Sequence, residues 1–176
     1  MRDQIVSDFL NTLARPAVPA PAGATVAALA LAQAAALLSR AAGGDAEADH
    51  LTRHALRLAE IDAHAVTHDV PDRAQPAADV VAAAGEVVRV AERLLSTVDS
   101  AALVDVSAAA EMAGSSARTA GVAVEARNGF AVGADAVAER AARVTAAVRV
   151  REGLLEGIRF PQGALHGHPA ADCGGV

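Results

Sequence analysis

The sequence predicts an all-α protein, an antiparallel bundle of about six helices. Hydrophobic residues make up 53% of the 176 positions but aromatic residues only 2%, so Ala, Val and Leu supply the core and let helices approach closely. Long segments carry apolar residues at helical spacing, and short Pro- or Gly-rich breaks separate them. We expect one helical domain over residues 1–160 and a flexible tail over residues 161–176.

The first two expected helices flank a proline-rich segment. Residues 2–14 place apolar side chains at helical spacing, as in a short amphipathic helix. Pro16, Pro19 and Pro21 then disfavour helix. Residues 25–42 are apolar almost all round but form a run shorter than a membrane span, so we expect a central, buried helix.

Four further helices follow from the same periodicity and from the breaks between them. They are expected at about residues 45–69, 76–96 and 103–126, and from 132 to 153 or slightly beyond. Pro76 suits the first turn of a helix, and Asn128-Gly129 suits the end of one. The segment at 103–126 is crowded with Ala, Gly and Ser, which predicts tight helix contacts on more than one of its faces.

Charge and cysteine content exclude several classes of function. The formal net charge of −6 argues against a general nucleic-acid-binding protein, which needs a basic face. Cys173 is the only cysteine, so no internal disulfide forms. Asp3, Asp8 and Asn11 lie where a secretion signal would be apolar. We expect a cytoplasmic protein with no nucleic-acid or membrane partner.

Polar residues at three places could carry chemistry, and each has a purely structural alternative. The helix start at Gly23, Ala24 and Thr25 offers free backbone N–H groups to an anion, or is a solvated cap. A second place is a helix face shared by Glu60, His64 and His68, with Asp62 on a neighbouring edge about a quarter turn or more away. Carboxylate and imidazole groups together suit proton transfer or metal ligation, or form a solvated helix side.

Asp105 stands alone in an apolar segment at the start of an expected helix. It is either an acid/base group in a pocket between helices or a first-turn carboxylate that the helix dipole stabilises. His50 and His54 are interpreted as part of a solvated face. The cluster around His166 and Cys173 lies in the Gly/Pro-rich tail, where we expect no metal site. No phosphate-binding loop, dinucleotide fingerprint or zinc cluster is present in the sequence.

The proline segment resembles the P-x-P-G-G-G-[ST]-x-A-A motif of the cyclodeaminase/cyclohydrolase family. The prolines, Gly23, Thr25 and the pair Ala27-Ala28 match it, whereas Ala22 and Ala24 stand where the family has glycine. That family includes the cyclodeaminase domain of formiminotransferase-cyclodeaminase and stand-alone methenyl-tetrahydrofolate cyclohydrolases.

Two further segments resemble the family in the same order along the chain. Asp62 and Ala65 match an x-x-D-x-x-A-[FY] signature, although Val66 replaces its aromatic residue. Asp105 and the residues after it match S-D-[VT]-x-x-A-A, although Val104 replaces the serine. Both asparagines of a later N-V-x-I-N motif are absent.

The resemblance implies an all-helical homodimer that acts on one-carbon tetrahydrofolates without a metal or redox cofactor. It implies Asp105 as the main acid/base or cation-stabilising group, Asp62 as the second carboxylate and His64 as a proton shuttle. The helix start at Gly23, Ala24 and Thr25 would receive an anionic part of the folate. The lost glycines, serine and asparagines favour an alternative, a relative without catalysis that survives as a folate-binding or structural dimer.

Overall fold

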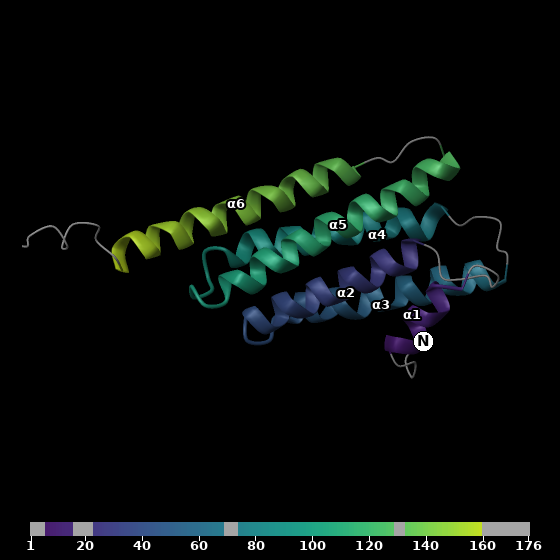
Figure 1. Cartoon of the computed structure of the whole chain (residues 1–176), viewed down its shortest axis with the longest axis horizontal. Helices are drawn as coiled ribbons and strands as arrows, with labels where there is room; N and C mark the ends of the chain where they lie inside the picture. The colour runs from purple at the N-terminus through teal and green to yellow at the C-terminus, as the bar shows by residue number, and fades with distance from the viewer. Residues whose placement is uncertain (1–5, 16–22, 69–73, 129–132, 160–176) are drawn as a thin grey trace, which may run out of the picture.

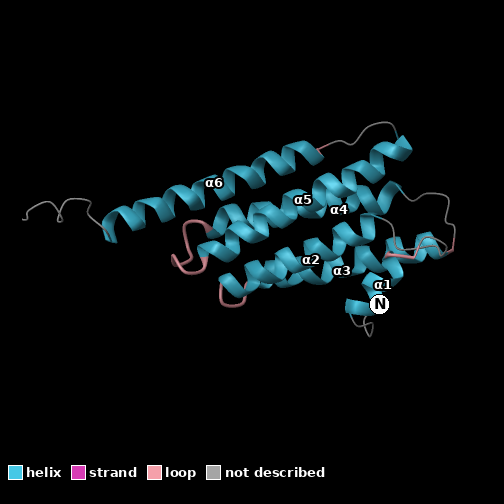
Figure 2. Ribbon diagram, viewed as in Figure 1, coloured by secondary structure: helices cyan, strands magenta, loops and turns pink. Residues whose placement is uncertain are grey.

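The protein is all-α, as predicted. A computed structural model describes residues 6–15, 23–68, 74–128 and 133–159, and these parts form helices with no strand (Figures 1 and 2). The helices are α1 (Val6–Leu13), α2 (Gly23–Ala41), α3 (Ala46–Thr67), α4 (Ala74–Leu94), α5 (Leu103–Asn128) and α6 (Ala134–Arg159). The predicted tail at 161–176 lies outside the described residues.

Helix α2 lies at the centre of the bundle, as its uniformly apolar sequence predicts. It packs against α3, α4 and α5, and Leu31 and Leu38 are among its fully buried side chains. Within the described part, α2 alone is long and apolar enough to cross a membrane, and 56% of that apolar window is buried inside the bundle. Its hydrophobicity is therefore largely accounted for by core packing.

A tight turn reverses the chain between α2 and α3. Gly43 and Gly44 adopt φ of 69° and 104°, a region that costs glycine no steric penalty. Asp45 then caps α3, because its Oδ1 accepts hydrogen bonds from the backbone N–H groups of Glu47 (3.0 Å) and Ala48 (2.9 Å). The two helices therefore pair as antiparallel neighbours.

Helices α2 and α5 also run antiparallel, although many residues separate them in the sequence. Gly23, at the start of α2, lies beside Thr119 in the C-terminal half of α5. At the other end of α2, Arg40 contacts Asp105 in the first turn of α5. Figure 1 shows the two helices side by side in the bundle.

The small residues of α5 allow the close contacts that the sequence predicts. A Cβ atom placed on Gly114 would lie 2.8 Å from the Cβ of Ala141 in α6, closer than real side chains approach. Helix α5 also packs against α2 and α4, and Ala109, Ala113 and Ala117 of α5 are fully buried. Helix α5 thus lies in contact with three other helices, α2, α4 and α6.

Ion pairs connect the outer ends of α3, α4 and α6. Arg93 of α4 donates to the capping residue Asp45 at 2.8 Å. The two carboxylate oxygens of Glu92 in α4 accept bidentate hydrogen bonds from the guanidinium of Arg140 in α6, at N–O distances of 3.1 and 2.6 Å. These pairs lie at the edge of the apolar core and link the three helices there.

Candidate functional site

Asp62 is the one charged side chain that is buried among the described residues. It lies on the inner side of α3 with an exposed fraction of 0%. The hydroxyl of Thr25, also 0% exposed, donates to its Oδ2 at 2.5 Å. Its Oδ1 has no hydrogen-bond partner within the described part of the chain. A buried carboxylate oxygen without a partner is energetically costly, and a functional role is one of the explanations for such a group.

The local sequence explains how the two side chains meet. Thr25 lies in the first turn of α2, close to the helix end where backbone N–H groups are free and the dipole favours negative charge. Asp62 shares the inner side of α3 with Leu58 and Ala65, which are also buried. Because both residues face the α2–α3 contact, this carboxylate is directed into the bundle and not toward solvent.

The other two residues of the predicted ligand-binding helix start differ in their environment. Gly23 is exposed, and an added Cβ would make only an ordinary contact of 3.9 Å with Thr119. Ala24 is fully buried and belongs to a small apolar cluster with Ala77 and Val124. Ala24 and Thr25 are fully buried, so Gly23 is the part of this helix start that is accessible from outside. Ala22 lies outside the described residues.

Asp105 lies at the opposite end of α2 from Asp62. Arg40, near the C-terminus of α2, donates to its two carboxylate oxygens at 3.1 and 2.6 Å. Thr25 and Arg40 are fifteen residues apart on one helix, a separation of roughly 22 Å at 1.5 Å per residue. The structure therefore does not bring the two predicted carboxylates together within one chain. Helices α3 and α5 both run antiparallel to α2 and therefore point the same way. Asp62 lies late in α3 and Asp105 early in α5, so the helix order and bounds of an antiparallel bundle already imply that they lie at opposite ends.

His64 faces away from Asp62, on the outer side of α3. Its ring stacks on that of His68 with centroids 4.0 Å apart, so the predicted shared face of these residues is present. His64 also lines a shallow cavity of about 350 Å³ together with Arg57, Glu60 and Ile61. A direct proton relay between His64 and Asp62 is not part of the observed geometry.

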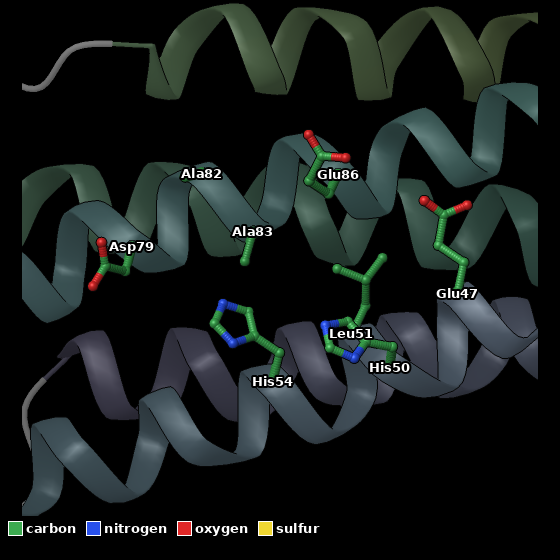
Figure 3. A pocket seen from close by; sticks show the side chains of 8 residues that line it. All are labelled: Glu47, His50, Leu51, His54, Asp79, Ala82, Ala83 and Glu86. Atoms are coloured by element: carbon green, nitrogen blue, oxygen red, sulfur yellow. The ribbon is translucent and has the colours of Figure 1, made fainter.

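A second cavity, of about 600 Å³, lies between α3 and α4, where Figure 3 shows it. Its α3 side carries His50 and His54, whose rings lie parallel with centroids 6.4 Å apart. Its α4 side carries Asp79 and Glu86, two turns apart. Sequence reasoning found the histidine pair and assigned it to a solvated face, but missed the acidic residues across from it, because they lie on another helix.

The charges around this second cavity are largely satisfied by other side chains. Glu47 and Glu86, two of its lining residues, both pair with Arg89. Asp79 accepts a hydrogen bond from Gln75 at 2.8 Å. Among the described residues, no group of three or more His, Cys, Asp or Glu side chains is arranged to hold a metal ion. This groove is therefore a polar surface feature and a weaker candidate for chemistry than Asp62.

Comparison with known proteins leaves the sequence resemblance without independent support. Neither a scan against protein-family models nor a search of curated proteins found a match to this chain.

Proposed function

We propose that the chain acts on a one-carbon tetrahydrofolate, as a formimino-tetrahydrofolate cyclodeaminase or a methenyl-tetrahydrofolate cyclohydrolase, with Asp62 as the proton-transferring group. One observation carries the proposal. Asp62 is the one buried charge of the described residues, with Oδ2 held by Thr25 and Oδ1 without a partner. The motifs around Thr25 and Asp62 resemble those of that enzyme family.

A single oriented carboxylate suits the chemistry in either direction. In ring closure, N10 attacks the formimino carbon on N5, a base takes the N10 proton, and an acid delivers a proton to the departing ammonia. In hydrolysis, a base removes a proton from the water that attacks the cationic amidine carbon. The C–N5 bond of the resulting carbinolamine then breaks as N5 takes a proton, which leaves the formyl group on N10. Asp62 Oδ1 would exchange the proton, while the Thr25 hydroxyl holds the other oxygen. The negative charge would also stabilise the cationic carbon.

The second candidate function is folate binding, or a structural dimer, without turnover. Two observations favour it: Asp62 is fully buried, and Asp105 is engaged by Arg40 at the other end of α2. Within one chain, the two carboxylates therefore cannot contact the same substrate molecule. This candidate predicts ligand-dependent stabilisation with no chemical conversion.

The absorbance of 5,10-methenyl-tetrahydrofolate in the presence of the pure protein separates these candidates. If the enzyme proposal is right, the protein accelerates either the loss of this compound, by hydrolysis, or its formation from 5-formimino-tetrahydrofolate, and Asp62→Asn lowers that rate by about a hundredfold or more. Asp135→Asn, the same change at an exposed position in the first turn of α6, is the matched control and should leave the rate unchanged.

Two other outcomes decide against the first candidate. A melting temperature that rises with the folate, with the methenyl absorbance neither lost nor formed from 5-formimino-tetrahydrofolate, would establish binding without turnover. If neither the absorbance nor the melting temperature changes, both folate functions are wrong. A rate that Asp62→Asn leaves intact would remove Asp62 from the mechanism.

A further inference from the structure

The outward side of α5 carries an exposed stripe that runs along the whole helix. Its residues are spaced alternately four and three apart: Val104, Ala108, Glu111, Ser115, Arg118, Val122 and Glu125. This is the repeat by which one helix packs along another. Val104 and Val122 are 59% and 65% exposed, which is unusual for valine. Ala108 and Ser115 are small enough for a second helix to approach closely.

The neighbouring outer side of α2 widens this surface. Val26 of α2 is 38% exposed, and Gln33 and Ala36 are exposed on the same helix. Arg40 is the only charged residue that α2 contributes to this surface, and it forms an ion pair with Asp105. Together the two helices form a face on which small and apolar residues outnumber the charged ones.

Two charges in the middle of the α5 stripe indicate what covers it. Glu111 and Arg118 have no ion-pair partner within the described part of the chain. They are two helical turns apart, about 10 Å, too far to pair with each other. An antiparallel copy of α5, centred between Gly114 and Ser115, places Glu111 opposite Arg118 of the second copy, and the reverse pair forms by symmetry.

We propose that this face of α5 and α2 binds a second copy of the chain about a two-fold axis near Ser115. The same register sets Val122 against Ser107 and the adjacent Ala108 of the second copy, which buries apolar surface on both sides, and it sets Val104 against Glu125. A parallel arrangement would set Glu111 against Glu111 and is disfavoured by charge repulsion.

The same arrangement has a consequence for the two separated aspartates. Asp105 of the second copy comes opposite Val124, which packs with Ala24 next to Thr25. The dimer therefore brings Asp105 of one copy to the end of the bundle where Asp62 of the other lies. This composite site rests on the proposed folate function, whereas the dimer itself does not.

Charge reversal on the stripe tests the dimer. Glu111→Arg and Arg118→Glu each replace two attractive pairs by two repulsive ones, and each should weaken self-association at least about tenfold by light scattering or sedimentation. The double variant restores opposite charges and should recover the dimer. Glu139→Arg, at an exposed position of α6, is the matched control and should leave it intact. A wild-type monomer at micromolar concentration, or a double variant that is no better than the singles, would overturn the proposal.

Mixing two inactive variants tests the composite site. Random pairing of Asp62→Asn with Asp105→Asn chains gives half mixed dimers, each with one site that holds both aspartates, so about a quarter of wild-type turnover should return. No recovery, with active wild-type protein and a confirmed dimer, would show that the aspartates do not act across the interface. A wild-type protein without turnover contradicts the proposed function, and the charge-reversal experiment then decides the dimer alone.

Discussion

Thr25 and Asp62 form the one polar contact in the described interior that joins two helices. The other buried hydroxyls, on Ser116 and Thr145, bond to carbonyls of their own helices. The Thr25–Asp62 hydrogen bond therefore favours one rotation of α3 relative to α2, which hydrogen bonds within a single helix cannot do. It also directs a carboxylate into an apolar interior, where an unmatched charge is expensive.

Removing the Thr25 hydroxyl should destabilise the protein through Asp62. Thr25→Val preserves the shape of the side chain but leaves both carboxylate oxygens without a donor, at a cost of about 1–3 kcal/mol in the free energy of unfolding. Thr25→Ser keeps the donor and should cost less. Urea unfolding of both variants measures the difference. A larger loss for Thr25→Ser than for Thr25→Val would show that the methyl group, not the hydrogen bond, is what matters here.

At the scale of the element, α5 decides how closely the bundle can pack. Its glycine and alanine residues contact α2, α4 and α6, and its outward stripe stays exposed. Gly114 is the tightest point, since even a methyl group would meet Ala141. Gly85 of α4 is looser, because an added Cβ would lie 3.5 Å from Val137 in ordinary contact.

Alanine at these two glycines should have opposite effects. Gly114→Ala forces α5 and α6 apart, an overpacking cost of about 1–3 kcal/mol that the gain of up to about 1 kcal/mol in helix propensity only partly offsets. Gly85→Ala takes the same propensity gain without a clash and should be neutral or stabilising. Thermal unfolding of the pair is the measurement. Equal melting temperatures would mean that the α5–α6 contact relaxes at no cost.

At the scale of the whole molecule, stability should depend on pH through the pairs that connect α3, α4 and α6. The hydrogen bond from Arg140 lowers the pKa of Glu92, and the backbone N–H of Ala48, aided by Arg93, lowers the pKa of Asp45. The folded state thus binds fewer protons than the unfolded chain. This stabilisation is complete at a pH above the ordinary pKa values, 4.5 for Glu92 and 3.8 for Asp45. It is lost as the pH falls below these values and through the lower pKa values of the folded state.

Urea unfolding between pH 7 and pH 3 tests this pH dependence. Glu92→Gln should lower stability at neutral pH, and the difference from wild type should shrink as the pH falls below about 4. Glu139→Gln changes an exposed carboxylate on α6 and is the control. Parallel stability curves for wild type and Glu92→Gln would contradict the assigned ion pair.

The N-terminal helix α1 should contribute little to the stability of the bundle. Among the described helices it contacts none of the other five, and Leu10 is 56% exposed. A chain that begins at residue 16 should therefore unfold within about 0.5 kcal/mol of the full chain. For comparison, Leu31→Ala in the core of α2 should cost about 2–5 kcal/mol. A truncation loss above 1 kcal/mol would mean that α1 packs against the protein in solution.

Much of the fold could be predicted because the signals for it are local. Apolar periodicity located each helix to within a few residues, although α6 continues to Arg159, several residues further than the expected end at 153 or slightly beyond. Gly43-Gly44 and Asp45 stop one helix and start the next through their own backbone and side-chain geometry. The central position of α2 followed from its lack of a polar side.

The sequence by itself thus determined the helices, their caps, the candidate aspartates and the all-α class. Only the tertiary structure decided that Asp62 is buried against Thr25, and that Asp105 pairs with Arg40. The physical reason is the composition of the core. Ala and Val side chains of nearly equal shape allow many offsets of one helix along another. The sum of all contacts therefore selects the observed offset, and this offset decides which side chains each carboxylate meets.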